Sequence, residues 1–248
     1  MNYLKHFGAM LLVISSATSS HAAVIVAPHN NDSNIVSVFG PFSQFSSPNQ
    51  VSSMRYQEVY AADEFSELSH GGGFITGVGC RIISGSRQGG IIPNLQIDLS
   101  TTARTPDALS TSFAENVGAD NRSVIGARSV WIQDNTPGDP TGFGVFIQFD
   151  SPFFYDPARG NLLMDVRNIE APPFVFSAGN FEGVKASGDS ISSLVASDVA
   201  AKTGNVGTSG MTTAFVVEPI PEPSTVSLVA LALPLLFFAV HRSKQQTN

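Results

Sequence analysis

The chain has 248 residues, a formal net charge of −7 and 13% charged residues. An acidic balance is the opposite of the basic surface that binds nucleic acid, so we expect no nucleic-acid partner. Cys80 is the only cysteine of the sequence, which excludes an intramolecular disulfide. The folded part must therefore be held by its apolar core, and Cys80 is expected to be a small buried member of that core.

The first 22 residues have the three-part layout of a secretory signal peptide. Lys5 and His6 precede an apolar core, Phe7 to Ile14, and a stretch rich in Ser and Ala ends at Ala22. That core is too short to span a bilayer, which separates a signal peptide from a membrane helix, and the Ser/Ala-rich stretch argues against an ordinary N-terminal core helix. Small residues at Ser20 and Ala22 suit signal peptidase, so we predict cleavage after Ala22 and export of the chain.

Residues 23–218 are numerous enough for one domain with its own core. Apolar segments in this region are short, and Gly, Pro, Asn, Asp and Ser separate them. Several alternate in polarity, as where Leu95, Ile97 and Leu99 share one face, which is typical of a half-buried strand. The candidate strands are Arg55 to Tyr60, Phe74 to Ile83, Asn94 to Thr101, Val124 to Gln133, Gly144 to Asp150, Asn161 to Val166, Phe174 to Ala178 and Met211 to Val217. Many short strands without crossover helices predict an all-β domain, an antiparallel β-sandwich of jelly-roll-like form.

Two stretches of this region do not have a strand pattern. Asp107 to Asn116 predicts a short helix or turn, with Asp107 as its cap after Pro106. Ser187 to Gly210 is mostly small and polar residues, and we expect a loose loop there.

Catalytic motifs are missing from the sequence, and we assign no catalytic residue and no cofactor. His29 and His70 are the histidines of the region between the two ends, and both are expected to be exposed loop residues. Asp134 and Asp139 lie in the loop DNTPGDPTG, where oxygen ligands on a turn are weak candidates for calcium binding. An ordinary turn held by Asp side chains is the favoured interpretation of that loop.

Residues 219–248 have three parts in a fixed order. Pro221, Glu222 and Pro223 come first, then an apolar run from Thr225 to Val240, then a short basic tail with Arg242 and Lys244. The apolar run predicts one short transmembrane helix, kinked at Pro234, and the tail indicates that the C-terminus is cytoplasmic. The alternative is a buried C-terminal core helix, which leaves the basic tail unexplained.

This ending resembles the PEP-CTERM sorting signal of Gram-negative bacteria, in its Pro-Glu-Pro motif, its helix and its basic tail. The resemblance implies recognition by exosortase, a membrane-embedded cysteine protease that removes the helix and releases or transfers the protein. The matching residues are Pro221, Glu222 and Pro223, with Arg242 and Lys244 as the cytoplasmic anchor. Prolines hold the motif extended, as a protease substrate must be, whereas a plain Pro-rich linker before a membrane anchor is the alternative.

Residues 55 to 168 also resemble a recurrent ectodomain of PEP-CTERM proteins, for which no activity is implied. The resembling blocks are Arg55 to Tyr60, Ile75 to Val78, Leu99 to Thr102, Leu109 to Asn116, Tyr155 to Pro157 and Gly160 to Leu163. This resemblance implies an architecture and a destination at the cell surface or in the extracellular matrix.

The leading hypothesis is therefore a non-catalytic surface or matrix protein with signal peptidase and exosortase as processing partners and the membrane as a transient one. The alternative is a carbohydrate-binding module for exopolysaccharide or another polymeric substrate, with Tyr60, Trp131 and Tyr155 as candidate aromatic contacts. A secreted hydrolase ranks last, because no convergent acids or activated nucleophile stand out. Reproducible binding to a defined polysaccharide would favour the carbohydrate-binding module over the surface protein. Turnover of a glycan or ester substrate would favour the hydrolase.

Overall fold

The computed structural model describes residues 22–29, 35–38, 40–42, 53–68, 71–83, 90–132, 138–169 and 181–220. All of them belong to one compact unit, His21–Ile220. The strands are β1 (Ala23–Ala27), β2 (Val36–Val38), β3 (Met54–Tyr60), β4 (Gly73–Cys80), β5 (Gly90–Thr102), β6 (Arg122–Ile132), β7 (Val145–Tyr155), β8 (Asn161–Asn168), β9 (Phe181–Lys185), β10 (Ile191–Ala196), β11 (Asn205–Gly207), β12 (Ser209–Met211) and β13 (Thr213–Pro219). Helix is limited, within these residues, to single turns: η1 (Ala62–Phe65), α1 (Phe113–Asn116) and η2 (Pro157–Arg159). The prediction of an all-β domain is confirmed.

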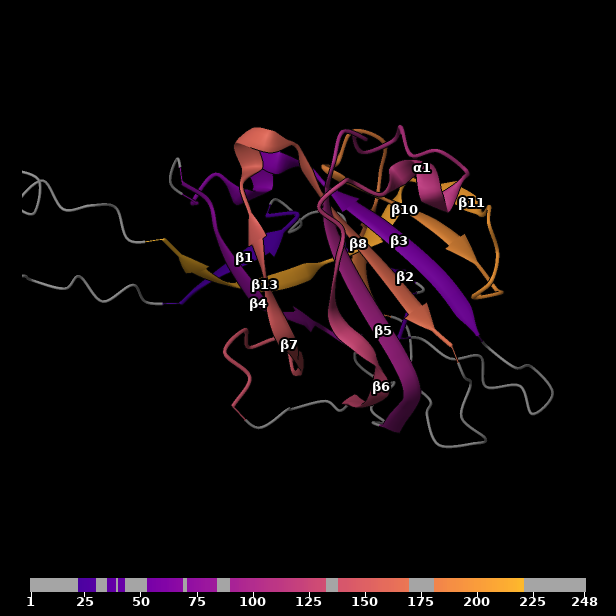
Figure 1. The fold of residues 1–248 in the computed structure, drawn as a ribbon, viewed down its shortest axis with the longest axis horizontal. Coiled ribbons are helices and arrows are strands. Elements are labelled where there is room, and N and C mark those ends of the chain that lie inside the picture. Colours follow the sequence, from indigo (N-terminus) through magenta and orange to yellow (C-terminus); the bar gives the residue numbers. More distant parts are fainter. Residues whose placement is uncertain are drawn as a thin grey trace, which may run out of the picture. The chain divides into compact units, whose positions relative to one another are not determined.

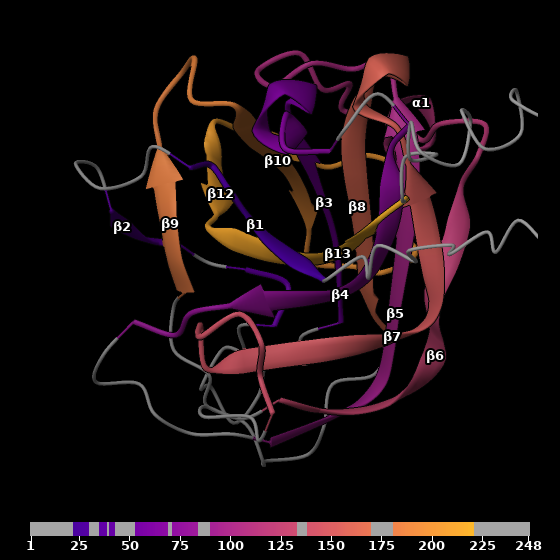
Figure 2. The same cartoon turned by 90° about the vertical axis from the view of Figure 1, so that its left-hand side faces the viewer.

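The strands form three antiparallel sheets, which are visible in Figures 1 and 2. Sheet I has the order β1-β13-β4-β7, and sheet II has the order β11-β10-β3-β8-β5-β6. The small sheet III has the order β12-β9-β2. Sheets I and II face each other, because side chains from both of them fill one continuous apolar core.

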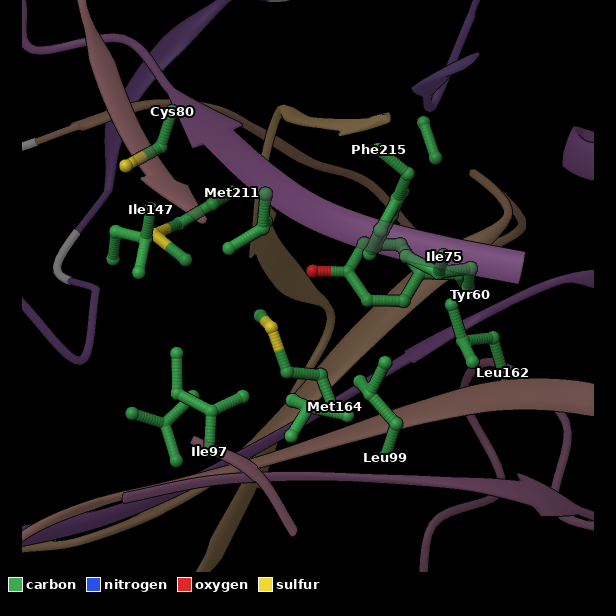
Figure 3. Close-up of a cluster of buried hydrophobic side chains, with 14 of the residues drawn as sticks. Tyr60, Ile75, Cys80, Ile97, Leu99, Ile147, Leu162, Met164, Met211 and Phe215 are labelled. Atoms are coloured by element: carbon green, nitrogen blue, oxygen red, sulfur yellow. The ribbon is translucent and has the colours of Figure 1, made fainter. Parts of the chain in front are cut away.

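Rings from the two large sheets meet directly in this core (Figure 3). Tyr60 on β3 and Phe215 on β13 pack edge to face, with ring centroids 5.0 Å apart. The Tyr60 hydroxyl lies 3.0 Å from Thr213 Oγ1, so a polar tip in the core has a partner. Ile97, Leu99, Leu162 and Met164 of sheet II face Ile75, Cys80 and Ile147 of sheet I in the same view. The domain is therefore sandwich-like.

The outer face of sheet II is also covered. Val59, Leu163 and Leu194 on its strands pack against Leu109 and Phe113 of the segment between β5 and β6. This second apolar cluster explains why the polar side of β5 is not half-exposed as expected, since Asp98, Ser100 and Thr102 are buried.

The structure corrects the assignment of Asp107. It does not cap α1, which begins only at Phe113. Asp107 has a φ of 61°, and its Oδ2 accepts hydrogen bonds from Ser187 Oγ at 2.8 Å and from the Gly188 N–H at 2.7 Å. It therefore holds the turn between β9 and β10, far away in sequence.

The prediction of a loose loop is also wrong for the segment Ser187 to Gly210, which is largely strand. It contains β10 and β11 and most of β12, and β10 pairs with β3 across six residues of each strand, from Ile191↔Tyr60 to Ala196↔Arg55. Ser192 and Ser193 are buried in β10, which forms because it pairs with β3 on one side and with β11 on the other.

Two predicted elements lie outside the described residues: the strand Phe174 to Ala178 and the transmembrane helix Thr225 to Val240. Within the part of the chain that is described, none of the helices has the length and apolar character needed to cross a membrane.

Candidate functional site

The first and last strands of the domain are neighbours at one end of sheet I (Figure 1). β1 begins at Ala23, directly after the predicted signal peptidase site, Ala22, which is exposed. β13 ends at Pro219, and Ala23 lies opposite Val217 in the antiparallel pair. The chain therefore enters and leaves the sheet at the same corner.

The residues of the sorting signal itself, Pro221, Glu222 and Pro223, and the anchor residues Arg242 and Lys244 lie outside the described residues. The structure does describe the chain up to Ile220, one residue before the motif. Ile220 is 39% exposed.

A row of three outward side chains crosses sheet I at this same end. Glu218 on β13 lies opposite Phe74 on β4, and Phe74 lies opposite Phe154 on β7. The two rings contact each other, with centroids 5.5 Å apart, and are 40% and 37% exposed. Directly paired residues of antiparallel strands point to the same face, so Glu218 flanks the rings. We call Glu218, Phe74 and Phe154 the terminal row.

A carboxyl group is buried in the core beneath β3. Tyr56, Glu58 and Tyr60 alternate along this strand and are all fully enclosed. Burial raises the pKa of Glu58 from its ordinary value to about 8, although a hydrogen bond from the Tyr56 hydroxyl, 2.9 Å from Oε2, lowers it. Glu58 Oε1 has no hydrogen-bond partner among the described residues. The core position of Glu58 therefore favours the protonated form of its carboxyl group.

The opposite face of the same strand carries a charged network. Asp165 on β8 is 2% exposed and accepts hydrogen bonds from Arg55 Nη2 at 2.7 Å and from Gln57 Nε2 at 2.8 Å. Arg167 lies 3.5 Å from Asp165 and 3.7 Å from Asp98 on β5. Arg167 thus bridges the neighbouring carboxylates of Asp165 and Asp98, which would otherwise repel each other.

The same network fastens α1 to sheet II. Gln57 Nε2 donates to the Phe113 carbonyl at 3.0 Å, and Asn116 Nδ2 donates to Gln57 Oε1 at 3.0 Å. The Arg55 guanidinium lies 4.4 Å from the centre of the Phe113 ring. This network was not predicted from the sequence, since the alternation of Arg55 and Gln57 with Tyr56 and Glu58 gives no sign of which face is covered. Their arrangement is structural, because each charge is already paired within the fold.

The three candidate sugar-binding aromatics are not brought together. Tyr60 and Tyr155 are buried, and Tyr155 donates its hydroxyl proton to the Gly160 carbonyl at 2.8 Å. Trp131 on β6 is 57% exposed and lies opposite Ile91, which is 39% exposed, on β5. Trp131 alone of the three presents much of its ring to solvent.

The candidate calcium loop is described only from Gly138 onward, so Asp134 lies outside the described residues. Asp139 Oδ1 accepts a hydrogen bond from the Thr141 N–H at 2.8 Å, and Oδ2 accepts one from the Gly144 N–H at 2.8 Å. Both carboxylate oxygens therefore close the turn itself. Among the described residues, no group of three or more acidic, His or Cys side chains gathers as a metal site would require.

His29, His70 and Cys80 have side chains of the types that serve as bases and nucleophiles. His29 is exposed, and both its backbone N–H and its Nδ1 lie within 2.8 Å of Glu64 Oε2, a buried carboxylate. His70 lies outside the described residues. Cys80 is buried, as expected, and burial raises the pKa of its thiol well above the ordinary value, which disfavours the thiolate.

Comparisons with known protein families, with curated proteins and with solved structures find no match for this chain. Its function therefore has to be inferred from its own residues.

Proposed function

We propose that this chain is an exported surface or matrix protein whose non-catalytic β domain is delivered by a signal peptide and released by exosortase. The observation that carries the proposal is the placement of β1 and β13. The first strand begins at the residue that follows the predicted signal peptidase site, and the last strand ends one residue before Ile220 and two before the Pro-Glu-Pro motif.

This placement suits a protein that is trimmed at both ends. The described pairing of β1 with β13 uses Ala23 to Ala27 and Thr213 to Val217, which both lie between the two proposed cleavage regions. Sheet I therefore keeps all its strands when either terminal segment is removed. The protease also needs an extended substrate, and Pro219, Pro221 and Pro223 keep residues 219–223 from becoming helical.

We further propose that the sandwich is a jelly roll. Eight of its strands, taken in chain order, are β1, β3, β4, β5, β6, β7, β8 and β13. Numbered one to eight, they follow the order 1-8-3-6 in sheet I and contain the run 2-7-4-5 in sheet II. These two orders arise when one long antiparallel hairpin wraps around a core, which is the jelly-roll topology. The strands β9 to β12 are then an insertion before the last strand.

Replacement of Pro221 and Pro223 with Ala tests the sorting proposal. Alanine lets helix propagate from the membrane segment toward Pro219, which denies the protease an extended strand. We expect the double variant to accumulate as uncleaved precursor in the inner membrane, while the wild type leaves it. A Ser224→Ala variant is the matched control, since it changes an adjacent side chain without removing a proline. Equal release of the double variant and the wild type contradicts the proposal.

A second candidate function is carbohydrate binding, which the exposure of Trp131 favours. An exposed indole beside an aliphatic side chain is a surface on which a sugar ring can stack. If the domain binds exopolysaccharide in this way, a glycan array shows reproducible binding, and Trp131→Ala abolishes it while Val206→Ala does not. Val206 is 39% exposed and lies on β11, at the other edge of sheet II. The absence of binding by the wild type excludes this candidate.

A further inference from the structure

We infer that the terminal row rests against lipid headgroups for as long as the precursor is anchored, and that exosortase cleavage ends this contact. The inference rests on the membrane helix of the proposed function. It adds an interaction surface, Phe74 and Phe154 with the neighbouring Ile220, and a partner, the outer leaflet of the membrane that holds the helix.

The first argument is chemical. The outward side of a sheet in water is expected to carry polar residues, yet two contacting phenylalanine rings lie there and each is more than a third exposed. Phe74 and Phe154 do not contribute to the core between sheets I and II, which Ile75, Phe153 and Tyr155 fill from the other face. Exposed aromatic rings of this kind are favoured at the boundary between water and lipid.

The second argument is the length of the chain that follows β13. Phe74 is paired with Glu218, so the rings lie beside the last residues of the strand. Residues 220–224 are all that separate β13 from the predicted start of the helix at Thr225. Fully extended, these residues span at most about 18 Å, and the headgroup layer itself takes up roughly 5–8 Å of that distance. The end of sheet I that carries the terminal row is thus held within reach of the headgroups.

The third argument sets the depth and strength of the contact. Glu218 flanks Phe74 in the same row and is exposed, so the row cannot enter the hydrocarbon without burying a carboxylate. The rings therefore lie at the headgroup level, and Glu218 repels anionic lipid. A contact of this kind is weak in free solution and persists because the tether keeps the domain at a high local concentration near the membrane. Cleavage removes the tether, so the released domain leaves the surface.

Fluorescence quenching by lipid tests this inference on the full chain. Trp131 is the only tryptophan of the sequence, so a Trp131→Phe background leaves no other reporter. In that background, Phe74→Trp and Phe154→Trp report from the terminal row. Ile91→Trp is the matched control, because Ile91 is 39% exposed but lies on β5 of sheet II. Each precursor is produced without exosortase and reconstituted in phosphatidylethanolamine and phosphatidylglycerol vesicles that contain a lipid with a spin label near its headgroup.

We expect the Phe74→Trp and Phe154→Trp variants to lose emission to the spin label and the Ile91→Trp variant to retain it. Treatment with exosortase should restore the lost emission. Unquenched emission from both row variants, in precursor that floats with the vesicles, overturns the inference while leaving the anchor intact. Precursor that does not float with the vesicles shows instead that the membrane helix of the proposed function is wrong. If the spin-labelled lipid does not quench the row variants but their tryptophan emission changes when exosortase is added, the terminal row contacts the protease instead of lipid. That result also overturns the inference.

Discussion

The two faces of β3, on which Glu58 lies, are in different environments. Gln57 and Val59, the neighbours of Glu58, face the loops that cover sheet II, whereas Glu58 points into the core with Tyr56 and Tyr60. A carboxylate there would lack water and an ion-pair partner, so burial keeps the group protonated, with a pKa of about 8. The fold therefore tolerates an acidic residue in its core by neutralising it.

This protonation makes stability depend on pH. The folded pKa of Glu58 lies above the ordinary value of 4.5, so the folded state binds the proton more tightly than the unfolded state does. The free energy of unfolding should be highest below pH 4.5, fall by about 1.4 kcal/mol per pH unit as the pH rises toward 8, and then level off as far as this group is concerned. Glu58→Gln should remove this contribution, because the amide has the same shape and no proton to lose.

Urea denaturation of the wild type and of Glu58→Gln at a series of pH values measures the effect. The other titrating groups are common to both proteins, so the difference between the two curves isolates Glu58. The variant should become the more stable protein as the pH approaches 8. Parallel curves would show that Glu58 is ionised in the folded state.

Asp165 and Asp150 form ion pairs that differ in burial and should therefore differ in how much they contribute to the free energy of unfolding. Asp165 is 2% exposed and pairs with Arg55, whereas Asp150 is 48% exposed and pairs with Arg128. Asp165→Ala leaves Arg55 without its carboxylate and one of the two amide N–H groups of the buried Gln57 without its acceptor, and should lower the free energy of unfolding by about 3–5 kcal/mol. Asp150→Ala leaves a solvated arginine and should cost about 1 kcal/mol or less. Chemical denaturation of both variants checks the contrast, and equal losses would contradict it.

Residues whose partners are local were easier to predict than those with distant partners. Asp139 was expected to hold a turn, and the N–H groups that donate to its carboxylate belong to Thr141 and Gly144 of the same turn. Asp107 was expected to cap a helix, but its partners are Ser187 and Gly188. Nothing near Asp107 in the sequence indicates a contact across such a distance.

The strands of sheets I and II that bury one clear apolar face were found from the sequence within a few residues. β3, β4, β5, β6, β7, β8 and β13 each overlap a predicted strand. β10 was missed because Ser192 and Ser193 interrupt its apolar residues and small polar residues surround it, β11 because it is only Asn-Val-Gly, and β1 because it follows the signal peptide directly. Their strand character comes from the pairing of β10 with β3, of β11 with β10 and of β1 with β13, which is a tertiary effect.

The connection from α1 to β6 provides a test of how tightly loops pack on sheet II. A Cβ at Gly118 would collide with the Thr101 carbonyl oxygen, which is backbone and cannot turn away. The Gly118 N–H also donates to Ser100 Oγ at 3.1 Å, so this segment lies directly on the end of β5.

Gly118→Ala should therefore lower the free energy of unfolding by about 1–3 kcal/mol. Gly126→Ala is the matched control, because a Cβ on that residue of β6 meets nothing within 4 Å. It should be neutral or stabilise the protein by up to about 1 kcal/mol, since alanine loses less backbone entropy on folding than glycine does. Thermal denaturation of the two variants compares them, and a neutral Gly118→Ala would mean that the segment can move off β5.

The chain as a whole is organised around the corner where β1 and β13 meet. The proposed sorting signals remain predictions from the sequence, which offers them because each is a continuous segment with a characteristic order of residue types. The sheet orders could not be read from the sequence, since they depend on pairings between strands as far apart as β1 and β13. That pairing forms one edge of sheet I and leaves both proposed cleavage regions beyond the paired residues, so the proposed cleavages would remove no paired residue of β1 or β13.

Intact-mass spectrometry of the protein recovered from the cell surface or matrix tests this account most directly. The chain should begin at Ala23 and end between Pro221 and Ser224, because signal peptidase and exosortase have each removed their segment. A surface protein that still carries Arg242 and Lys244 would contradict cleavage and indicate a permanent membrane anchor.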